Sequence, residues 1–267
     1  MLAVDNKVYY TLRVASAMCF IGHGAFGIIT KQIWCNYFAV FGIGHNMAYH
    51  LMPVLGSVDI LFGITLLAYP TRAVLLWLVA WGIITASLRP LSGEPFAEFI
   101  ERAGNFGAPL TLVLVCGVSG KSFKEWFTSI KPGVITNEKN LATATMCLRV
   151  VVFLLLTGHG WLNLLDKKGI MGQYTSLGFS NPAKVALVVG VFEIVSAFLI
   201  LIKPIRGILI VILVWKVGTE LFYPHWEVFE WIERGGSYGS ILALLLLLPQ
   251  SSRTTSDLPL NNHVPAV

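Results

Sequence analysis

Long apolar stretches recur along the chain and are separated by short polar segments. They lie at residues 9–30, 50–69, 71–90, 104–120, 145–166, 183–203, 205–222 and 236–249. About 20 apolar residues are enough for an α-helix to cross the hydrocarbon core of a bilayer. The pattern therefore predicts an all-α, polytopic membrane protein with eight transmembrane helices.

The two halves of the sequence resemble one another. The stretch "LRVASAMCFIGHG" matches "LRVVVFLLLTGHG", which pairs Arg13 with Arg149 and His23 with His159. Such self-similarity at one offset indicates an internal repeat. The other matched pairs are Asp59 with Glu193, Pro70 with Pro204, Arg72 with Arg206, Trp81 with Trp215, Thr85 with Thr219, Glu101 with Glu233 and Arg102 with Arg234.

Each repeat contains four predicted helices, so both repeats enter the membrane in the same direction. We therefore expect two parallel four-helix bundles related by an axis along the membrane normal. The predicted organisation is a first repeat at residues 1–125, a cytoplasmic linker at 126–143, a second repeat at 144–250 and a polar C-terminal tail at 251–267.

Composition agrees with a membrane location. Of 267 residues, 55% are hydrophobic and 12% are charged, and the charged fraction is about half that of a typical soluble domain. If the N-terminus lies inside, the inner segments hold ten Lys and Arg residues against seven in the outer loops. This bias predicts that both termini lie in the cytoplasm, and we expect the membrane to be a bacterial inner membrane. It also accounts for the net charge of +5 without a nucleic-acid partner.

Charged residues inside predicted helices need partners, because burying a charge in a bilayer is costly. Glu193 and Lys216 lie at similar depths on either side of the turn at Pro204, so we expect a buried ion pair between them. The pair is either a fixed structural contact or part of proton handling. Both readings remain open on the sequence alone.

Asp59 matches Glu193, but Gly82 stands where the second repeat has Lys216. Asp59 must then find His23, Thr85 or water, or stay protonated through desolvation. Asp59 and His23 are therefore the candidate proton-handling, and so catalytic, residues.

Each repeat-related histidine stands between two glycines within an apolar run. The favoured interpretation is a neutral histidine that hydrogen-bonds a carboxylate or a backbone oxygen, with His23 the more titratable of the two. The glycines would let a neighbouring helix or a flat ligand approach the backbone closely. Haem ligation by His23 and His159 is a less favoured alternative. His45 and His50 are five positions apart, whereas metal-binding helices prefer four, so no metal site is predicted.

Two acidic stretches, "EPFAEFIERAG" and "HWEVFEWIERGG", lie in the predicted outer loops. Their period predicts short helices at the outer membrane interface. The expected partner-docking residues on them are Glu98, Glu101, Glu230 and Glu233. At the inner surface, Arg13 and Arg149 are expected to reach headgroups or the ends of neighbouring helices.

The repeated arginine, apolar run and histidine–glycine step resemble the first helix of DoxX-like membrane proteins. The acids in "VDILFGITLL" and "FEIVSAFLIL" resemble that family's second-helix glutamate. The resemblance implies two fused four-helix units over residues 9–120 and 145–249, and an association with membrane redox systems such as thiosulfate:quinone oxidoreductases. Many members carry a lysine four residues after the histidine, whereas Gly27 and Asn163 stand there in this chain.

Three functions follow for this protein. The first is an accessory subunit of a larger complex, without catalysis of its own, that docks other membrane or periplasmic subunits. The second is a quinone-linked redox component in which Asp59 and His23 move protons. The third is a transporter of a small molecule or lipid between the repeats. The absence of a nucleophile–base pair or phosphate-binding loop favours the first, and the sequence names neither substrate nor oligomeric state.

Overall fold

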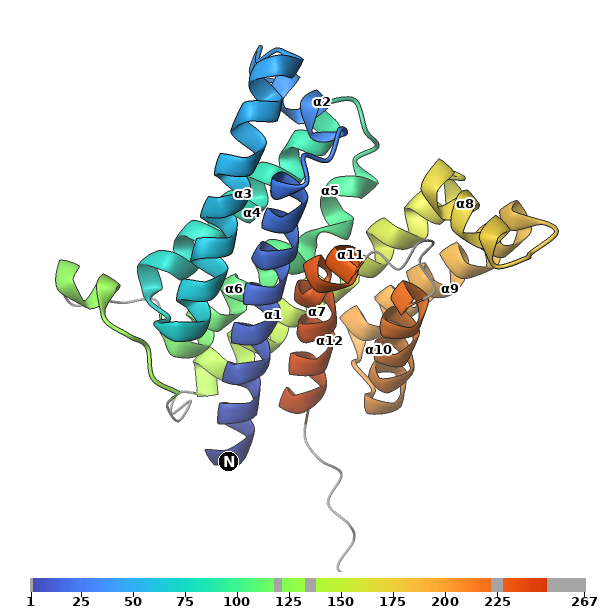
Figure 1. The fold of residues 1–267 in the computed structure, drawn as a ribbon. Helices are drawn as coiled ribbons and strands as arrows, with labels where there is room; N and C mark the ends of the chain where they lie inside the picture. The colour runs from blue at the N-terminus through green and yellow to red at the C-terminus, as the bar shows by residue number, and fades with distance from the viewer. Residues whose placement is uncertain (1, 118–121, 133–137, 222–227, 249–267) are drawn as a thin grey trace, which may run out of the picture.

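The computed structural model describes residues 2–117, 122–132, 138–221 and 228–248. These residues form helices joined by short connections (Figure 1), with an isolated bridge between Thr71 and Ser129 and no strand among them. We call residues 2–117 the first half and residues 138–248 the second half. The predicted tail at 251–267 lies outside the described residues.

Within the described residues, five helices are long and apolar enough to cross a membrane. They are α1 (Leu2–Ile28), α3 (His45–Ala68), α4 (Arg72–Leu91), α7 (Glu138–Leu164) and α9 (Pro182–Ile202). All five fall on predicted apolar stretches. The chain is therefore an all-α protein with five candidate membrane spans.

The other three apolar stretches also form helices, but shorter ones. These are α6 (Ala103–Cys116), α10 (Arg206–Leu221) and α12 (Gly235–Leu247), of 14, 16 and 13 residues. At about 1.5 Å per residue they are about 21, 24 and 20 Å long, against about 30 Å for a hydrocarbon core. Their length alone does not make them spans, so the prediction of eight crossings is not established by the fold.

Short helices connect the long ones at the end away from the N-terminus (Figure 1). Two of them, α5 (Ala97–Glu101) and α11 (Val228–Glu233), fall on the acidic stretches. The others are α2 (Trp34–Ala39) and α8 (Lys168–Ser176), which were not predicted. Helix α2 has six residues and α8 contains two glycines, so neither shows a strong periodic pattern. The 3₁₀-helix η1 (Phe123–Phe127) crosses the predicted boundary between the first repeat and the linker.

The two halves interleave. Helix α5 of the first half packs on α7 of the second, and α11 of the second half packs on α1 of the first. Helices α1 and α12 also pack together, as do α6 and α7. A single hydrophobic cluster consequently contains buried residues from both halves, among them Leu12, Leu112, Leu155 and Ile241.

Two arginine side chains bind the ends of neighbouring helices. Arg13 and Arg149 each donate to two carbonyl oxygens at the end of the neighbouring helix, α3 or α9. Of the two roles expected for them, the structure has the contact with helix ends. The acceptors are Leu66 and Leu67 for Arg13, and Leu201 and Ile202 for Arg149.

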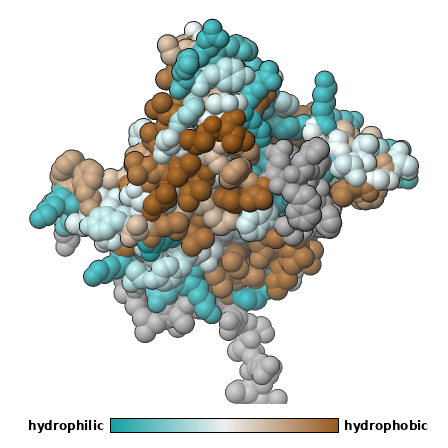
Figure 2. All heavy atoms as spheres, viewed as in Figure 1, coloured by the Kyte–Doolittle hydropathy of each residue, from teal (hydrophilic) through white to brown (hydrophobic). Residues whose placement is uncertain are grey.

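The outer surface has the distribution expected around a bilayer. A broad apolar area covers the middle of the face seen in Figure 2, and hydrophilic residues gather at its upper end. Large side chains on the sides of α3 and α9 contribute to the apolar surface, including Leu61, Ile64, Val188 and Val195. The charged residues discussed below lie inside, between the helices.

Candidate functional site

A histidine–carboxylate pair lies inside each half. His23 Nδ1 on α1 is 2.7 Å from Asp59 Oδ2 on α3, and His159 Nδ1 on α7 is 2.5 Å from Glu193 Oε2 on α9. Asp59 is 1% exposed and Glu193 is fully buried. Such carboxylates are costly without a partner. In each half the histidine is that partner.

The glycine after each histidine admits the helix that carries the acid. A β-carbon added to Gly24 would lie under 3.0 Å from the carbonyl oxygen of Gly56, and one on Gly160 would do the same to Gly190. The close approach of α3 to α1, and of α9 to α7, thus depends on paired glycines, as in many membrane helix interfaces.

The glycine before each histidine admits the other half of the protein. A β-carbon on Gly22 would lie under 3.0 Å from the backbone of Glu233, and one on Gly158 would do the same to Glu101. Each "GHG" step therefore places its histidine between its own acid-bearing helix on one side and the opposite half's short helix on the other.

In the second half, the carboxylate of Glu193 contacts three partners. Besides His159, Glu193 accepts a hydrogen bond from Trp215 Nε1 at 3.1 Å through its other oxygen. The same oxygen is 3.6 Å from Lys216 Nζ, and Lys216 is 4% exposed. The structure thus brings the expected ion-pair residues together. That Trp215 shares the acid was not predicted from the sequence.

The first half is simpler around its acid. Asp59 is bonded to His23, while the hydroxyl of Thr85 donates to the carbonyl oxygen of Trp81 at 3.0 Å. Thr219, the matched threonine, likewise bonds a backbone oxygen of its own helix, that of Lys216. Neither threonine contacts an acid.

A cavity of about 300 Å³, here called the first cavity, opens beside His23. The Trp34 ring lies 4.6 Å from the His23 ring, centroid to centroid. Most of the wall is apolar, including Phe38, Leu51, Leu55 and Trp81. The polar residues that line it are His23, Asp59, Thr85, Arg89, Arg102, Asn105 and Glu233.

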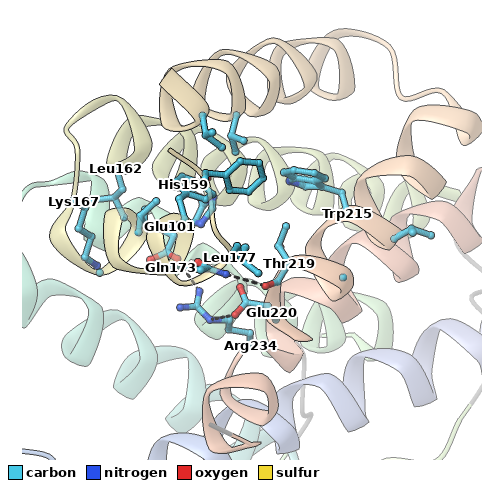
Figure 3. Close-up of a pocket in the computed structure, with 18 residues that line it drawn as sticks. Glu101, His159, Leu162, Lys167, Gln173, Leu177, Trp215, Thr219, Glu220 and Arg234 are labelled. Carbon is cyan, nitrogen blue, oxygen red and sulfur yellow. Dashed lines mark hydrogen bonds and ion pairs between the residues drawn. The ribbon is translucent and has the colours of Figure 1, made fainter. Parts of the chain in front are cut away.

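A second cavity, of about 510 Å³, opens beside His159 (Figure 3). Trp215 lies on one side of it. On the other, Gln173 Nε2 donates to the carbonyl oxygen of Thr219 at 3.0 Å, and Arg234 Nε is 3.0 Å from Glu220 Oε2. Its apolar wall includes Leu162, Ile170, Leu177, Phe179 and Val189.

Two Glu–Arg dipeptides join the two cavities. Arg102 stands at the break between α5 and α6, and Arg234 at the break between α11 and α12. Arg102 and Glu233 line the first cavity, whereas Glu101 and Arg234 line the second. Each cavity therefore has an arginine of its own half and a glutamate of the other. The same four residues line a void of about 20 Å³ between the cavities, which is room for about one water.

The four glutamates expected to dock a partner point inward instead. Glu98, Glu101, Glu230 and Glu233 are each at most 9% exposed. The amphipathic pattern predicts a face that docks a partner, but the glutamates are buried against cations of both halves of the same chain. The ion pairs are Glu98 with Arg89, Arg102 and Lys167, Glu101 with Arg102 and Arg234, and Glu230 with Lys31 and Arg234.

These cations control how the glutamates titrate. Burial alone would raise the pKa of Glu101, yet the guanidinium groups of Arg102 and Arg234 hold that pKa well below its usual range. Burial is likewise outweighed at Glu230, whose pKa is lowered by Arg234 and Lys31. Glu101 and Glu230 are therefore ionised at neutral pH.

Asn163 was noted only as a departure from a family pattern, and it is part of the second site. Fully buried, it donates to the backbone oxygen of His159 at 3.0 Å and accepts from the Tyr174 hydroxyl at 2.7 Å. Tyr174 lies on α8, and because that helix was not predicted, its role at the site was not predicted either. Gly27, the matched position, packs against the backbone of α3, where a side chain would not fit.

The arrangement does not fit a haem held by both histidines. His23 and His159 line different cavities, and the Nδ1 atom of each is engaged by a carboxylate. In the described part of the chain, no group of three or more His, Cys, Asp or Glu side chains is placed to hold a metal ion.

Comparison with known proteins found a similarity to one family over the second site. Residues 144–213 match the DoxX family model. The matched segment contains both His159 and Glu193 and runs from α7 into α10. No curated protein and no solved structure was found to match the chain. Together with the apolar helices, the match identifies an integral membrane protein.

Proposed function

We propose that this DoxX-like membrane protein binds a quinone-type molecule inside its helices, as a subunit of a membrane redox complex. The observation that carries the proposal is the pair of apolar cavities that each end at a buried histidine–carboxylate pair. Volumes of about 300 and 510 Å³ lie in the range typical of small-molecule sites. Apolar walls suit a ligand that arrives from the bilayer.

The histidine can exchange a proton with a ligand oxygen. Its Nδ1 atom is taken by the carboxylate, so Nε2 is the ring atom left for a ligand. A protonated ring donates from Nε2 to a quinone carbonyl, and a neutral ring accepts a proton from a quinol hydroxyl. The buried carboxylate stabilises the charged ring, as in other acid–base sites.

Protons are only half of quinone chemistry, because a quinol that is oxidised also gives up two electrons. The histidine–carboxylate pairs handle the protons. The proposal therefore includes a redox-active partner subunit that supplies or accepts the electrons. The buried glutamates of α5 and α11 are not the surface on which that partner docks, since their own chain already neutralises them.

The proposed membrane arrangement is eight crossings in two parallel halves, with both termini in the cytoplasm. Contacts that recur at matched positions support it, such as Arg13 and Arg149 on helix ends and Gly22 and Gly158 under short helices. Helices α5 and α6 follow each other with Arg102 between them, and α11 and α12 do so with Arg234.

A binding titration tests the function. Decylubiquinone, a short-tailed quinone, is titrated calorimetrically into the full-length protein in mild detergent, with wild type, His23→Gln and His159→Gln compared. Glutamine keeps a hydrogen bond but cannot titrate, so we expect each variant to bind about tenfold more weakly at its own cavity. His50→Gln is the matched control, because His50 is exposed and lines neither cavity. A wild-type protein that does not bind the quinone would refute the proposal.

A further inference from the structure

We infer that the indole N–H of Trp81 is a ligand-binding donor in the first cavity, where it recognises an acceptor oxygen of the bound molecule. The inference rests on the proposed function and adds a specificity to it. Trp215, the matched residue of the second half, has no such role. The two cavities therefore recognise different features of a ligand.

Trp81 presents a buried donor that no protein group satisfies. The residue lies on α4 and lines the first cavity together with His23 and Asp59. Its Nε1 atom is buried and has no acceptor among the described residues. Buried donors are almost always hydrogen-bonded, and a native exception calls for an absent water or ligand.

The ring is not free to turn away and find a partner elsewhere. It stacks on Trp77, with the ring centroids 6.0 Å apart and the planes 9° from parallel. The hydroxyl of Thr85, one turn further along the helix, donates to the backbone oxygens of Trp81 and Gly82, and the indole nitrogen forms no hydrogen bond to it. The donor is thus fixed in place beside the cavity.

The second half shows what satisfies the same indole when a longer acid is present. Trp215 Nε1 donates to Glu193 Oε1 at 3.1 Å, while Glu193 Oε2 holds His159. Asp59 has one methylene fewer than Glu193 and holds His23 alone. A single methylene group therefore separates an indole bonded to its own protein from one left for a ligand.

The chemistry of the ligand follows from these two points. An acceptor oxygen, such as a quinone carbonyl or a ring methoxy group, can bond Trp81 while another oxygen meets His23. The indole nitrogen is buried in this structure, so the atoms that cover it must move apart as the ligand enters. In the second cavity the indole of Trp215 is already bonded to Glu193, so a ligand there meets His159 without an indole donor beside it.

The test compares Trp81→Phe with Trp215→Phe in the full-length protein, again with decylubiquinone as the probe. Phenylalanine keeps an aromatic ring, removes the donor and is smaller than the indole, and Trp215→Phe controls for the lost volume. Both changes are also made in the His159→Gln background, so that binding reports mainly the first cavity. Trp81→Phe should weaken binding about tenfold, the value of one hydrogen bond, and Trp215→Phe less than about twofold.

Asp59→Glu is a second variant that keeps the acid. Its longer side chain can reach Trp81, as Glu193 reaches Trp215, so it too should weaken quinone binding at the first cavity. If Trp81→Phe and Asp59→Glu both bind the quinone as wild type does, the inference is wrong while the proposed function stands. If wild type binds no quinone, both fall.

Discussion

Arg234 and Glu101 lie 133 positions apart in the chain, yet the Nη1 atom of the arginine is 2.9 Å from Oε1 of the glutamate. The contact joins the break between α11 and α12 to the end of α5. Lys31 with Glu230, 2.5 Å apart, and Lys167 with Glu98 also cross between the halves, at matched positions. Charged residues that the sequence pattern placed at an outer surface thus hold the two halves together.

Removal of Arg234 should destabilise the protein strongly. Arg234→Met leaves Glu101 buried with Arg102 as its remaining partner, and such a change costs about 3 kcal/mol, the low end for a broken buried pair. We expect a lower melting temperature in detergent, partly restored by adding Glu101→Gln. Lys203→Met, which removes an exposed cation, is the control. Equal melting temperatures for Arg234→Met and the control would show that the pair is not structural.

Acid should separate the halves. The pKa of Glu101 is lowered well below its ordinary value of 4.5, and those of Glu98 and Glu230 are lowered too. A carboxylate with a lowered folded-state pKa stabilises the protein above its unfolded-state pKa, and that stability is lost as the pH falls through the folded-state value. Melting temperature should therefore fall steeply below about pH 4.5. In Glu101→Gln protein the fall should be shallower; an unchanged slope would remove Glu101 from the cause.

Lys216→Met should destabilise the second half without unfolding it. Glu193 would keep its hydrogen bonds with His159 and Trp215 but lose its ion pair with the Lys216 ammonium group. The expected cost is again about 3 kcal/mol. Lys184→Met, at an exposed position of α9, is the control for loss of a lysine. A Lys216→Met protein as stable as that control would argue against a buried ion pair.

The glycine before each histidine should tolerate no side chain. Gly22→Ala and Gly158→Ala push a methyl group into the backbone of the opposite short helix, which cannot yield as a flexible side chain could. We expect each to cost about 1–3 kcal/mol, the range for overpacking, and to weaken quinone binding at the adjacent cavity. Gly207→Ala, with nothing within 4 Å of an added β-carbon, should be neutral or stabilising. Differential scanning fluorimetry compares the three directly.

The helices were predictable because a bilayer sets the length of an apolar run. The approach of His23 to Asp59 was also within reach of the sequence, since depth along two adjacent helices follows from residue counts. The destination of α5 and α11 was not predictable, because an amphipathic pattern identifies a polar face and not the surface that covers it. The hydrogen bond from Trp215 to Glu193 was not predictable for a similar reason. A tryptophan near a predicted membrane interface shows the same sequence pattern whether its nitrogen binds lipid headgroups or a carboxylate.

Helices α5 and α11 each pack on the opposite half, and this affects which substitutions the two halves can accept independently. Neither half encloses its cavity alone, so two separate four-helix chains would have to find each other in the membrane and could also pair like with like. Covalent linkage in one polypeptide enforces a one-to-one stoichiometry of unlike halves. Asp59 can then differ from Glu193, and Gly82 from Lys216, without any mismatched assembly. For the same reason, a substitution in α5 or α11 also changes the cavity of the opposite half.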